Sequence, residues 1–120
     1  PRSRSRSRTR TRRRTRTRYR VTLSNRGQRT DNNVELRVVF PPELAPDPTT
    51  VQGPPGVQFN KTGNELEFTP LNGFRPTEEA TYWIDATAVA AGTGRIVVQA
   101  RSGNQPEAIS AAADVEVIDR

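Results

Sequence analysis

Arginine is the residue whose chemistry and spacing stand out first. The chain begins PRSRSRSRTRTRRRTRTRYR, in which eleven of the twenty residues are arginine and nearly every second position holds one. Guanidinium groups form paired hydrogen bonds with phosphate and carboxylate, so such a run is typical of polyanion binding. The candidate binding residues are Arg2, Arg4, Arg6, Arg8, Arg10, Arg12, Arg13, Arg14, Arg16 and Arg18.

This arginine-rich segment has no aromatic residue before Tyr19. Base stacking is therefore absent, and binding to nucleic acid would ignore sequence and weaken steeply with salt. Its serines at positions 3, 5 and 7 alternate with Arg as in an RS repeat, whose phosphorylation would reverse the charge balance. A second interpretation is that the segment is a self-repelling disordered tail without a specific role.

Catalytic chemistry has few candidates in this sequence. It contains no His and no Cys, which removes the commonest general base and the thiol nucleophile. Glu65 and Glu67 lie two residues apart on an expected strand, about 7 Å from each other, a separation that paired-carboxylate hydrolysis can use. Their alternation with Leu66 and Phe68 instead indicates a solvated face, and we expect no enzyme.

Acidic residues could also supply the hard oxygen ligands that Ca²⁺ prefers. Their spacing matches no calcium loop, so we expect surface acids, no metal and no cofactor. The residues considered are Glu78, Glu79, Asp85, Asp114, Glu116 and Asp119.

Two weaker patterns concern sugars. Asn60-Lys61-Thr62 fits the N-glycosylation pattern, although a hairpin turn explains the same residues. Phe74, Tyr82 and Trp83 could form a sugar-stacking patch, whereas a single Trp in an all-β domain is more often a packing residue.

The charge of the chain divides near Tyr19. Eleven of the nineteen basic residues and none of the thirteen acids lie in the first twenty positions, so the remaining eight basic residues leave the body at −5. The net +6 of the whole chain therefore describes only its beginning. We expect two parts, a low-complexity basic arm at 1–18 and a single folded domain at 19–119.

The body alternates apolar and polar residues over short runs separated by Gly and Pro, which predicts strands rather than helices. On the longest run, Tyr82, Ile84, Ala86 and Ala88 are expected to face inward and Trp83 outward. The proline-rich stretch 41–56 is expected to be a shaped loop. The seven predicted strands are 19–25, 32–40, 57–59, 65–68, 79–89, 95–101 and 109–119.

Seven short strands with tight turns predict an all-β, seven-stranded, immunoglobulin-like antiparallel sandwich that follows a disordered basic arm. No apolar run approaches the length of a membrane span, and no signal-peptide pattern is present. The sequence also lacks Met, so we expect a processed, excised or incomplete chain whose signal peptide lies outside it.

The order of motifs in the body resembles a known family. The motifs are Tyr19-Arg-Val-Thr-Leu-Ser-Asn25, Gly27, Asn33-Val34, Phe40-Pro-Pro-Glu-Leu44, Glu65-Leu-Glu-Phe68, Leu71 to Pro76, Thr81-Tyr82 and the strands from Val97 onward. Together, over 19–118, they resemble the conserved repeat domain of bacterial cell-surface proteins, a domain-of-unknown-function family that planctomycete envelope proteins carry in tandem. The family's usual glycine after Pro76 is Thr77 here.

The resemblance implies a non-enzymatic structural or adhesive module, outside the cell or in its envelope, within a larger protein. Its partners would be neighbouring repeat domains, other envelope proteins or polysaccharide, bound through loops such as 41–56 and 102–107 or through strand edges. The alternative is sequence-nonspecific binding of nucleic acid or another polyanion through the arginines, if the arm is genuine.

The genetic code gives a third interpretation of the arm. Repeats of the resembled type are joined by acidic Val/Glu linkers, and this chain itself ends in DVEVID at 114–119. A Val-Glu repeat read one base late encodes Ser-Arg, so the arm could be an out-of-frame linker. Independent resequencing that finds one uninterrupted frame would exclude this hypothesis.

Overall fold

The computed structural model describes residues 6–105 and 109–118, with side chains from Arg10 onward. Every element in this part of the chain is a β-strand, and none of its residues forms a helix that could cross a membrane. The strands are β1 (Arg6–Arg12), β2 (Arg16–Ser24), β3 (Val34–Val39), β4 (Leu44–Gln52), β5 (Phe59–Thr62), β6 (Glu65–Leu71), β7 (Glu79–Ala88), β8 (Gly92–Arg101) and β9 (Ile109–Ile118).

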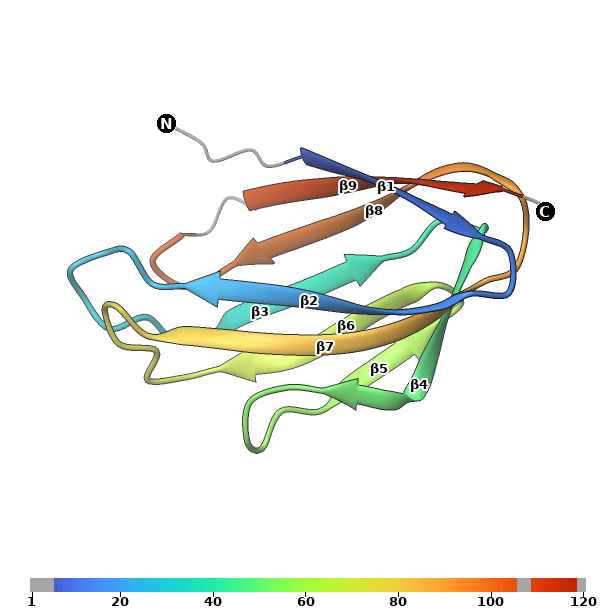
Figure 1. Ribbon diagram of the computed structural model, residues 1–120. Helices are drawn as coiled ribbons and strands as arrows, with labels where there is room; N and C mark the ends of the chain where they lie inside the picture. The colour runs from blue at the N-terminus through green and yellow to red at the C-terminus, as the bar shows by residue number, and fades with distance from the viewer. Residues whose placement is uncertain (1–5, 106–108, 119–120) are drawn as a thin grey trace.

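The strands form two sheets packed against each other, which confirms the all-β sandwich (Figure 1). One sheet has six strands in the order β1-β9-β8-β3-β6-β5, and the other has three in the order β2-β7-β4. Among the described strands, β1 and β9 pair in parallel and all other pairs are antiparallel. The prediction of seven strands is wrong, because the described residues form nine.

The core lies between the sheets and is built from alternate residues of each strand. In β7 the alternation holds for all ten residues, so Tyr82 and Ile84 are buried while Trp83 faces away from the core, as predicted. The Tyr82 hydroxyl finds no hydrogen-bond partner among the described residues, and burial raises its pKa to about 12. The other large buried side chains include Leu36, Val38, Phe40, Leu44, Leu66, Phe68, Phe74, Ile96, Val115 and Val117.

The first strand that the sequence analysis did not predict is β1, which lies inside the expected disordered arm. That expectation is wrong for the described part of the arm, because residues 6–12 pair with β9 and residues 16–18 begin β2. Ser and Thr alternate with Arg here, and a two-residue period with β-branched Thr suits a strand. β2 also runs without a break across the expected boundary between residues 18 and 19.

The chain passes from one sheet to the other between β1 and β2. Backbone hydrogen bonds hold this crossing to both sheets: Arg13 N–H donates to Ile118 O at 2.9 Å and Arg14 N–H to Ala88 O at 2.6 Å. Arg14 adopts a φ of 73°, a left-handed backbone conformation that residues other than glycine rarely take. The crossing places β1 at the end of the six-stranded sheet and β2 at the edge of the three-stranded sheet.

The second added strand is β4, within the stretch predicted to be a proline-rich loop. That expectation is wrong for residues 44–52. Proline cannot donate to a strand partner and is tolerated at sheet edges, and β4 is such an edge with an irregular register between Asp47 and Gln52. Pro46 is buried, so one proline of this strand contributes to the core.

Two turns are set by left-handed residues. Gly63 has a φ of 59° between β5 and β6, which confirms the predicted hairpin. Thr77 has a φ of 70° in the turn that precedes β7. It occupies the position where the resembled family has glycine, and a β-branched residue is strained there.

Candidate functional site

The outward side chains of β2 form the centre of the candidate site. Along this strand the exposure alternates from Arg16 to Ser24, so Arg16, Arg18 and Arg20 face solvent while Thr17 and Tyr19 face the core side. β7 lies beside β2, with Arg18 opposite Asp85 and Arg20 opposite Trp83. Three consecutive outward arginines therefore lie against one carboxylate and one indole ring.

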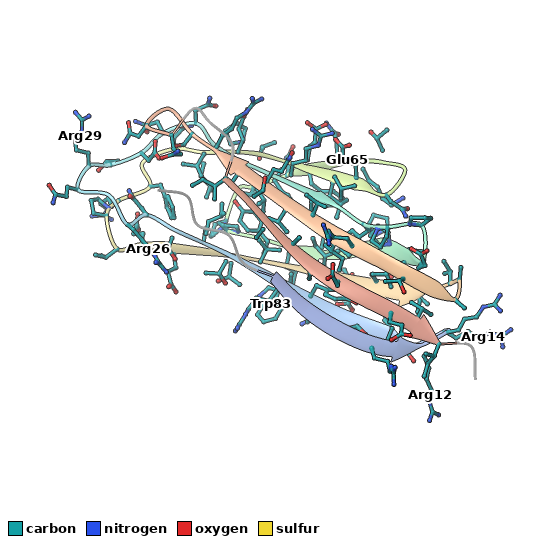
Figure 2. The ribbon with its side chains drawn as sticks, turned by 90° about the horizontal axis from the view of Figure 1, so that it is seen from above. Arg12, Arg14, Arg26, Arg29, Glu65 and Trp83 are labelled. Atoms are coloured by element: carbon teal, nitrogen blue, oxygen red, sulfur yellow. The ribbon has the colours of Figure 1, made fainter. Side chains whose placement is uncertain are left out.

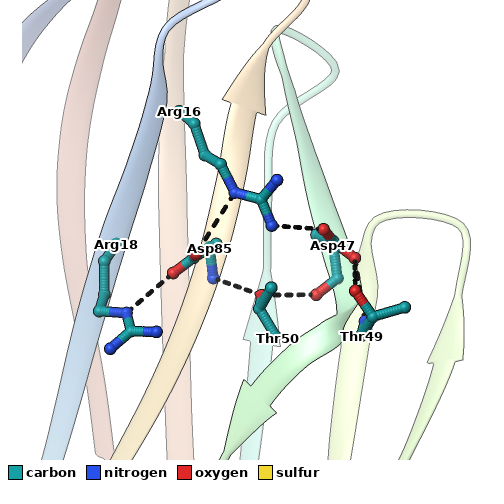
Figure 3. Close-up of polar contacts among 6 residues, drawn as sticks. All are labelled: Arg16, Arg18, Asp47, Thr49, Thr50 and Asp85. Atoms are coloured by element: carbon teal, nitrogen blue, oxygen red, sulfur yellow. Dashed lines mark hydrogen bonds and ion pairs between the residues drawn. The ribbon is translucent and has the colours of Figure 1, made fainter.

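Two carboxylates lie directly opposite each other on the neighbouring strands β4 and β7. Asp47 and Asp85 are register partners, and like charges in that position repel. Arg16 lies between them, with Nη2 at 2.5 Å from Asp47 Oδ2 and Nε at 3.3 Å from Asp85 Oδ2 (Figure 3). Arg18 Nε binds the other oxygen of Asp85 at 3.0 Å. The arm thus neutralises an acidic pair that belongs to the body.

Asp47 is also held by its own turn. Its Oδ1 accepts hydrogen bonds from the Thr49 hydroxyl at 2.7 Å and the Thr49 backbone N–H at 2.9 Å. These bonds, followed by the nearby Arg16, lower the pKa of Asp47 below its usual value. Thr50 connects the two carboxylate residues, because its hydroxyl donates to Asp47 O and accepts from Asp85 N–H (Figure 3).

Trp83 is a half-buried aromatic residue on the outer face of the three-stranded sheet. The guanidinium carbons of Arg18 and Arg20 lie 5.7 Å and 5.8 Å from its ring centroid, within cation–π range. Arg20 makes no ion pair with any described residue, so its charge stays available to a ligand. This face therefore combines an aromatic ring with an unneutralised cation.

The sugar-stacking patch considered for Phe74, Tyr82 and Trp83 is not formed. Phe74 and Tyr82 are buried in the core, whereas Trp83 lies on the opposite side of its sheet. The acids considered for calcium are also spread over both sheets, and the described residues contain no group of three that could hold a metal. Asp119 lies outside the described residues.

The remaining arginines of the arm lie near β9 and at the crossing between the sheets. Arg10 Nη2 lies 3.2 Å from Glu116 Oε1 on β9, and Arg13 Nε donates to Val89 O at 3.3 Å. Arg12 and Arg14 project at one end of the molecule (Figure 2). Neither forms an ion pair with a described residue.

The structure divides the ten predicted arginines into three groups. Arg2 and Arg4 lie outside the described residues, and only the backbone of Arg6 and Arg8 is described. The described side chains either contact the body or, like Arg12 and Arg14, face solvent at the crossing. These last six are Arg10, Arg12, Arg13, Arg14, Arg16 and Arg18.

The sequence prediction missed three residues of the site. Arg20 was not among the candidate binding arginines, and Asp47 and Asp85 were not expected to be partners of the arm. Arg20 continues the alternation of Arg16 and Arg18 and could have been found by extending that pattern two residues further. The closeness of Asp47 to Asp85 has no such signal, because it depends on which strands are neighbours. Two more exposed arginines, Arg26 and Arg29, lie at the end of the molecule opposite Arg12 and Arg14 (Figure 2).

Two of the hollows in the surface of the described residues can be compared with the candidate site. One, of about 320 Å³, lies beside the apolar side chains of Val51, Val57 and Phe59. The other, of about 180 Å³, lies among polar side chains that include Glu35 and Gln99. Neither contains the arginines of β2 or Trp83, so we do not place the candidate site in a pocket.

Comparison with known proteins gives the fold. No family model and no curated protein matches the sequence. The structure is similar to a non-cellulosomal cohesin from the hyperthermophilic archaeon Archaeoglobus fulgidus, with a TM-score of 0.62 and 8% identity, over 93% of this chain and 87% of that one. It is also similar to part of a family 123 glycoside hydrolase from Clostridium perfringens, with a TM-score of 0.62 and 11% identity, over 97% of this chain but 23% of that one. At these identities the likeness establishes the β-sandwich fold alone.

Proposed function

We propose that the chain is a non-enzymatic structural or adhesive module within a larger bacterial envelope or secreted protein. The observation that carries this proposal is the parallel pairing of the first and last strands, β1 and β9. The described chain enters along β1 and leaves along β9 in the same direction. Arg6 lies opposite Ala112, so the exit at Ile118 is about 20 Å further along the sheet.

This geometry suits modules arranged end to end. When the first and last strands run in parallel, the chain continues away from the domain instead of turning back over it. The similarity to a cohesin supports the module fold. The match to only 23% of the glycoside hydrolase chain supports the use of this fold as one part of a longer protein. The resemblance to tandem bacterial surface repeats points to the same use.

The adhesive part of the proposal is supported by the outer face around Trp83. Trp and Arg are the residues most enriched at energetically dominant positions of protein interfaces. Here they lie together on the outer face, with Arg20 free of ion pairs among the described residues. Neighbouring modules, envelope proteins and polysaccharide are the partners we propose.

Protease treatment of intact cells tests the location. An epitope placed next to the module in the full-length protein is expected to be cleaved without cell lysis, and a cytosolic control protein is expected to survive. Full protection of the epitope, with release only after lysis, would overturn the proposal.

Small-angle scattering of two linked copies tests the geometry, because end-to-end modules give an elongated particle.

A second function, polyanion binding, is favoured by one observation. The exposed side chains of Arg12, Arg14, Arg20, Arg26 and Arg29 make no ion pair with a described residue. Deleting the whole arm does not test this function cleanly, because it also removes β1 and the start of β2. Replacing Arg12 and Arg14 with Gln is cleaner, and loss of heparin or duplex binding with a lower salt dependence is expected.

A further inference from the structure

β1 forms the end of the six-stranded sheet and is paired on one side only. Its seven residues pair with β9, and no described strand pairs with its other edge (Figure 1). Such an edge exposes backbone N–H and C=O groups over about 23 Å, and these groups can pair with an added strand. Addition of an extended peptide to a free edge is a common mode of peptide recognition.

The outer face of this sheet is organised by opposite charges on neighbouring strands. At least one ion pair crosses each strand junction from β6 to β1, and the four pairs named below have distances of 3.2 Å or less. Opposite charges on adjacent strands favour their pairing, whereas like charges oppose it. The pairs are Glu65–Arg37, Glu35–Arg101, Arg95–Asp114 and Glu116–Arg10.

This series ends on positive charge at β1. Arg10 and Arg12 are two residues apart on one face, about 6.6 Å along the strand. Arg10 has its acidic partner on β9, but Arg12 lies opposite Ile118 and makes no ion pair with a described residue. The next strand in the series would therefore be acidic.

We propose that the free edge of β1 binds an extended acidic peptide whose carboxylates occupy alternate positions. Backbone pairing would supply the affinity, and Arg10 and Arg12 would select the charge. β9 provides the internal example, because it presents Asp114 and Glu116 at alternate positions and docks against β1 on its paired side. The inference deepens the proposed adhesive function by naming the chemistry of a partner.

The repetitive sequence of β1 gives this edge a particular specificity. Arg recurs at every second position from 6 to 12, so a shift by two residues restores the same pattern. The pairing register of an added peptide on β1 is then weakly specified. The edge therefore selects peptides by the alternation of their charges more than by their exact sequence. The same arginines oppose addition of uncharged or basic strands, which is how charged edges protect sheets from aggregation.

The proposal is tested with the purified chain and a short fluorescent peptide of alternating Thr and Glu. A composition-matched peptide with the same residues in paired order, Thr-Thr-Glu-Glu, is the control. At low ionic strength, fluorescence anisotropy is expected to show about ten-fold tighter binding of the alternating peptide. Hydrogen exchange is expected to slow at the amides of residues 6–12. Equal affinity for both peptides, or no binding, would overturn the proposal.

Two charge reversals locate the binding surface. Arg12→Glu is expected to weaken binding by about ten-fold, whereas Lys61→Glu makes the same charge change on β5, at the opposite end of the same sheet, and leaves binding unchanged. Arg12→Lys retains the charge and most of the binding, which distinguishes charge selection from misfolding. Equal weakening by both reversals would mean general polyanion attraction. Because these measurements use the isolated chain, they fail or succeed independently of where the full protein resides.

Discussion

β1 and β2 share one sequence pattern but are held in the sandwich in different ways. β1 alternates Arg with Ser or Thr throughout, β2 begins with the same alternation at Arg16, Thr17 and Arg18, and both strands lie at the end of a sheet. β2 continues into Tyr19, Val21 and Leu23, which pack against the core, and its arginines bind Asp47 and Asp85. β1 has no such apolar continuation. Its position depends on backbone pairing with β9 and on exposed arginines such as Arg10.

The difference shows that charge alternation alone can build a strand but specifies its register weakly. In β2, a slip by two residues would move Tyr19 and Val21 away from their places against the core. In β1, the same slip replaces Arg with Arg and Thr or Ser with another small hydroxyl residue. We therefore expect β2 to be integral to the fold and β1 to be a replaceable edge.

Truncation is expected to give the largest difference in stability between loss of β1 alone and loss of β1 together with the start of β2. Removing residues 1–12 deletes β1 and is expected to lower the free energy of unfolding by about 1–2 kcal/mol, because an edge strand is lost. Removing residues 1–18 also deletes the arginines that neutralise the largely buried Asp85, and the loss is expected to be larger by roughly 2–3 kcal/mol. Urea denaturation measures both. Equal destabilisation by the two truncations would contradict the comparison.

Single arginines give the next contrast. Arg18→Ala removes the ion pair with Asp85 and the cation–π contact with Trp83, and a loss of about 1–1.5 kcal/mol is expected. Arg10→Ala removes an ion pair whose side chains are 68% and 43% exposed, so a loss of only a few tenths of a kcal/mol, about 0.3, is expected. A double-mutant cycle between Arg18 and Asp85 separates the pair from the indole contact. A coupling energy near zero would mean that Arg18 acts through Trp83 alone.

The strained residues at the two ends of β2 sharpen the comparison further. Arg14 precedes β2 with a φ of 73°, and Thr77, with a φ of 70°, donates its N–H to Asn25 O just after the strand ends. Glycine adopts this conformation without strain, so Thr77→Gly is expected to stabilise the fold by about 1 kcal/mol and Arg14→Gly by about 0.5 kcal/mol. Ala at either position gives no comparable gain. Thermal denaturation measures the order of the four variants.

Much of the fold was predictable from the sequence, and the exceptions have physical causes. The alternation in β7 correctly placed Tyr82 and Ile84 in the core and Trp83 outside it, because apolar and polar residues differ strongly in hydration. β1 was missed because both of its faces are polar, so its alternation resembles a solvated tail. β4 was missed because its prolines suggest a loop, although an edge strand tolerates them.

The candidate site was less predictable than the fold. The arginines were visible in the sequence, but their partners were not. Asp47 and Asp85 approach each other because β4 pairs with β7, and the arginines reach them because β2 pairs with the other side of β7. Both pairings are long-range properties of the fold. Charge composition therefore identified the residues and suggested an external polyanion, whereas the topology supplied internal carboxylates for Arg16 and Arg18.

The acid sensitivity of the fold gives the smallest expected difference between the β2 region and β1. It depends on the carboxylate of Asp47, which binds Arg16 on β2. Hydrogen bonds from Thr49 and the nearby Arg16 hold the pKa of Asp47 below its unfolded value. Its contribution to stability is therefore present above about pH 4 and is lost as the pH falls through the lower, folded pKa. Thr49→Ala removes the largest cause of the lowered pKa and should flatten this acid loss, whereas Arg10→Ala on β1 should leave it unchanged. Urea midpoints between neutral pH and about pH 3 measure the difference. Equal acid sensitivity of both variants would contradict this expectation. Of the described side chains of β1 and β2, only Arg16 on β2 contacts Asp47.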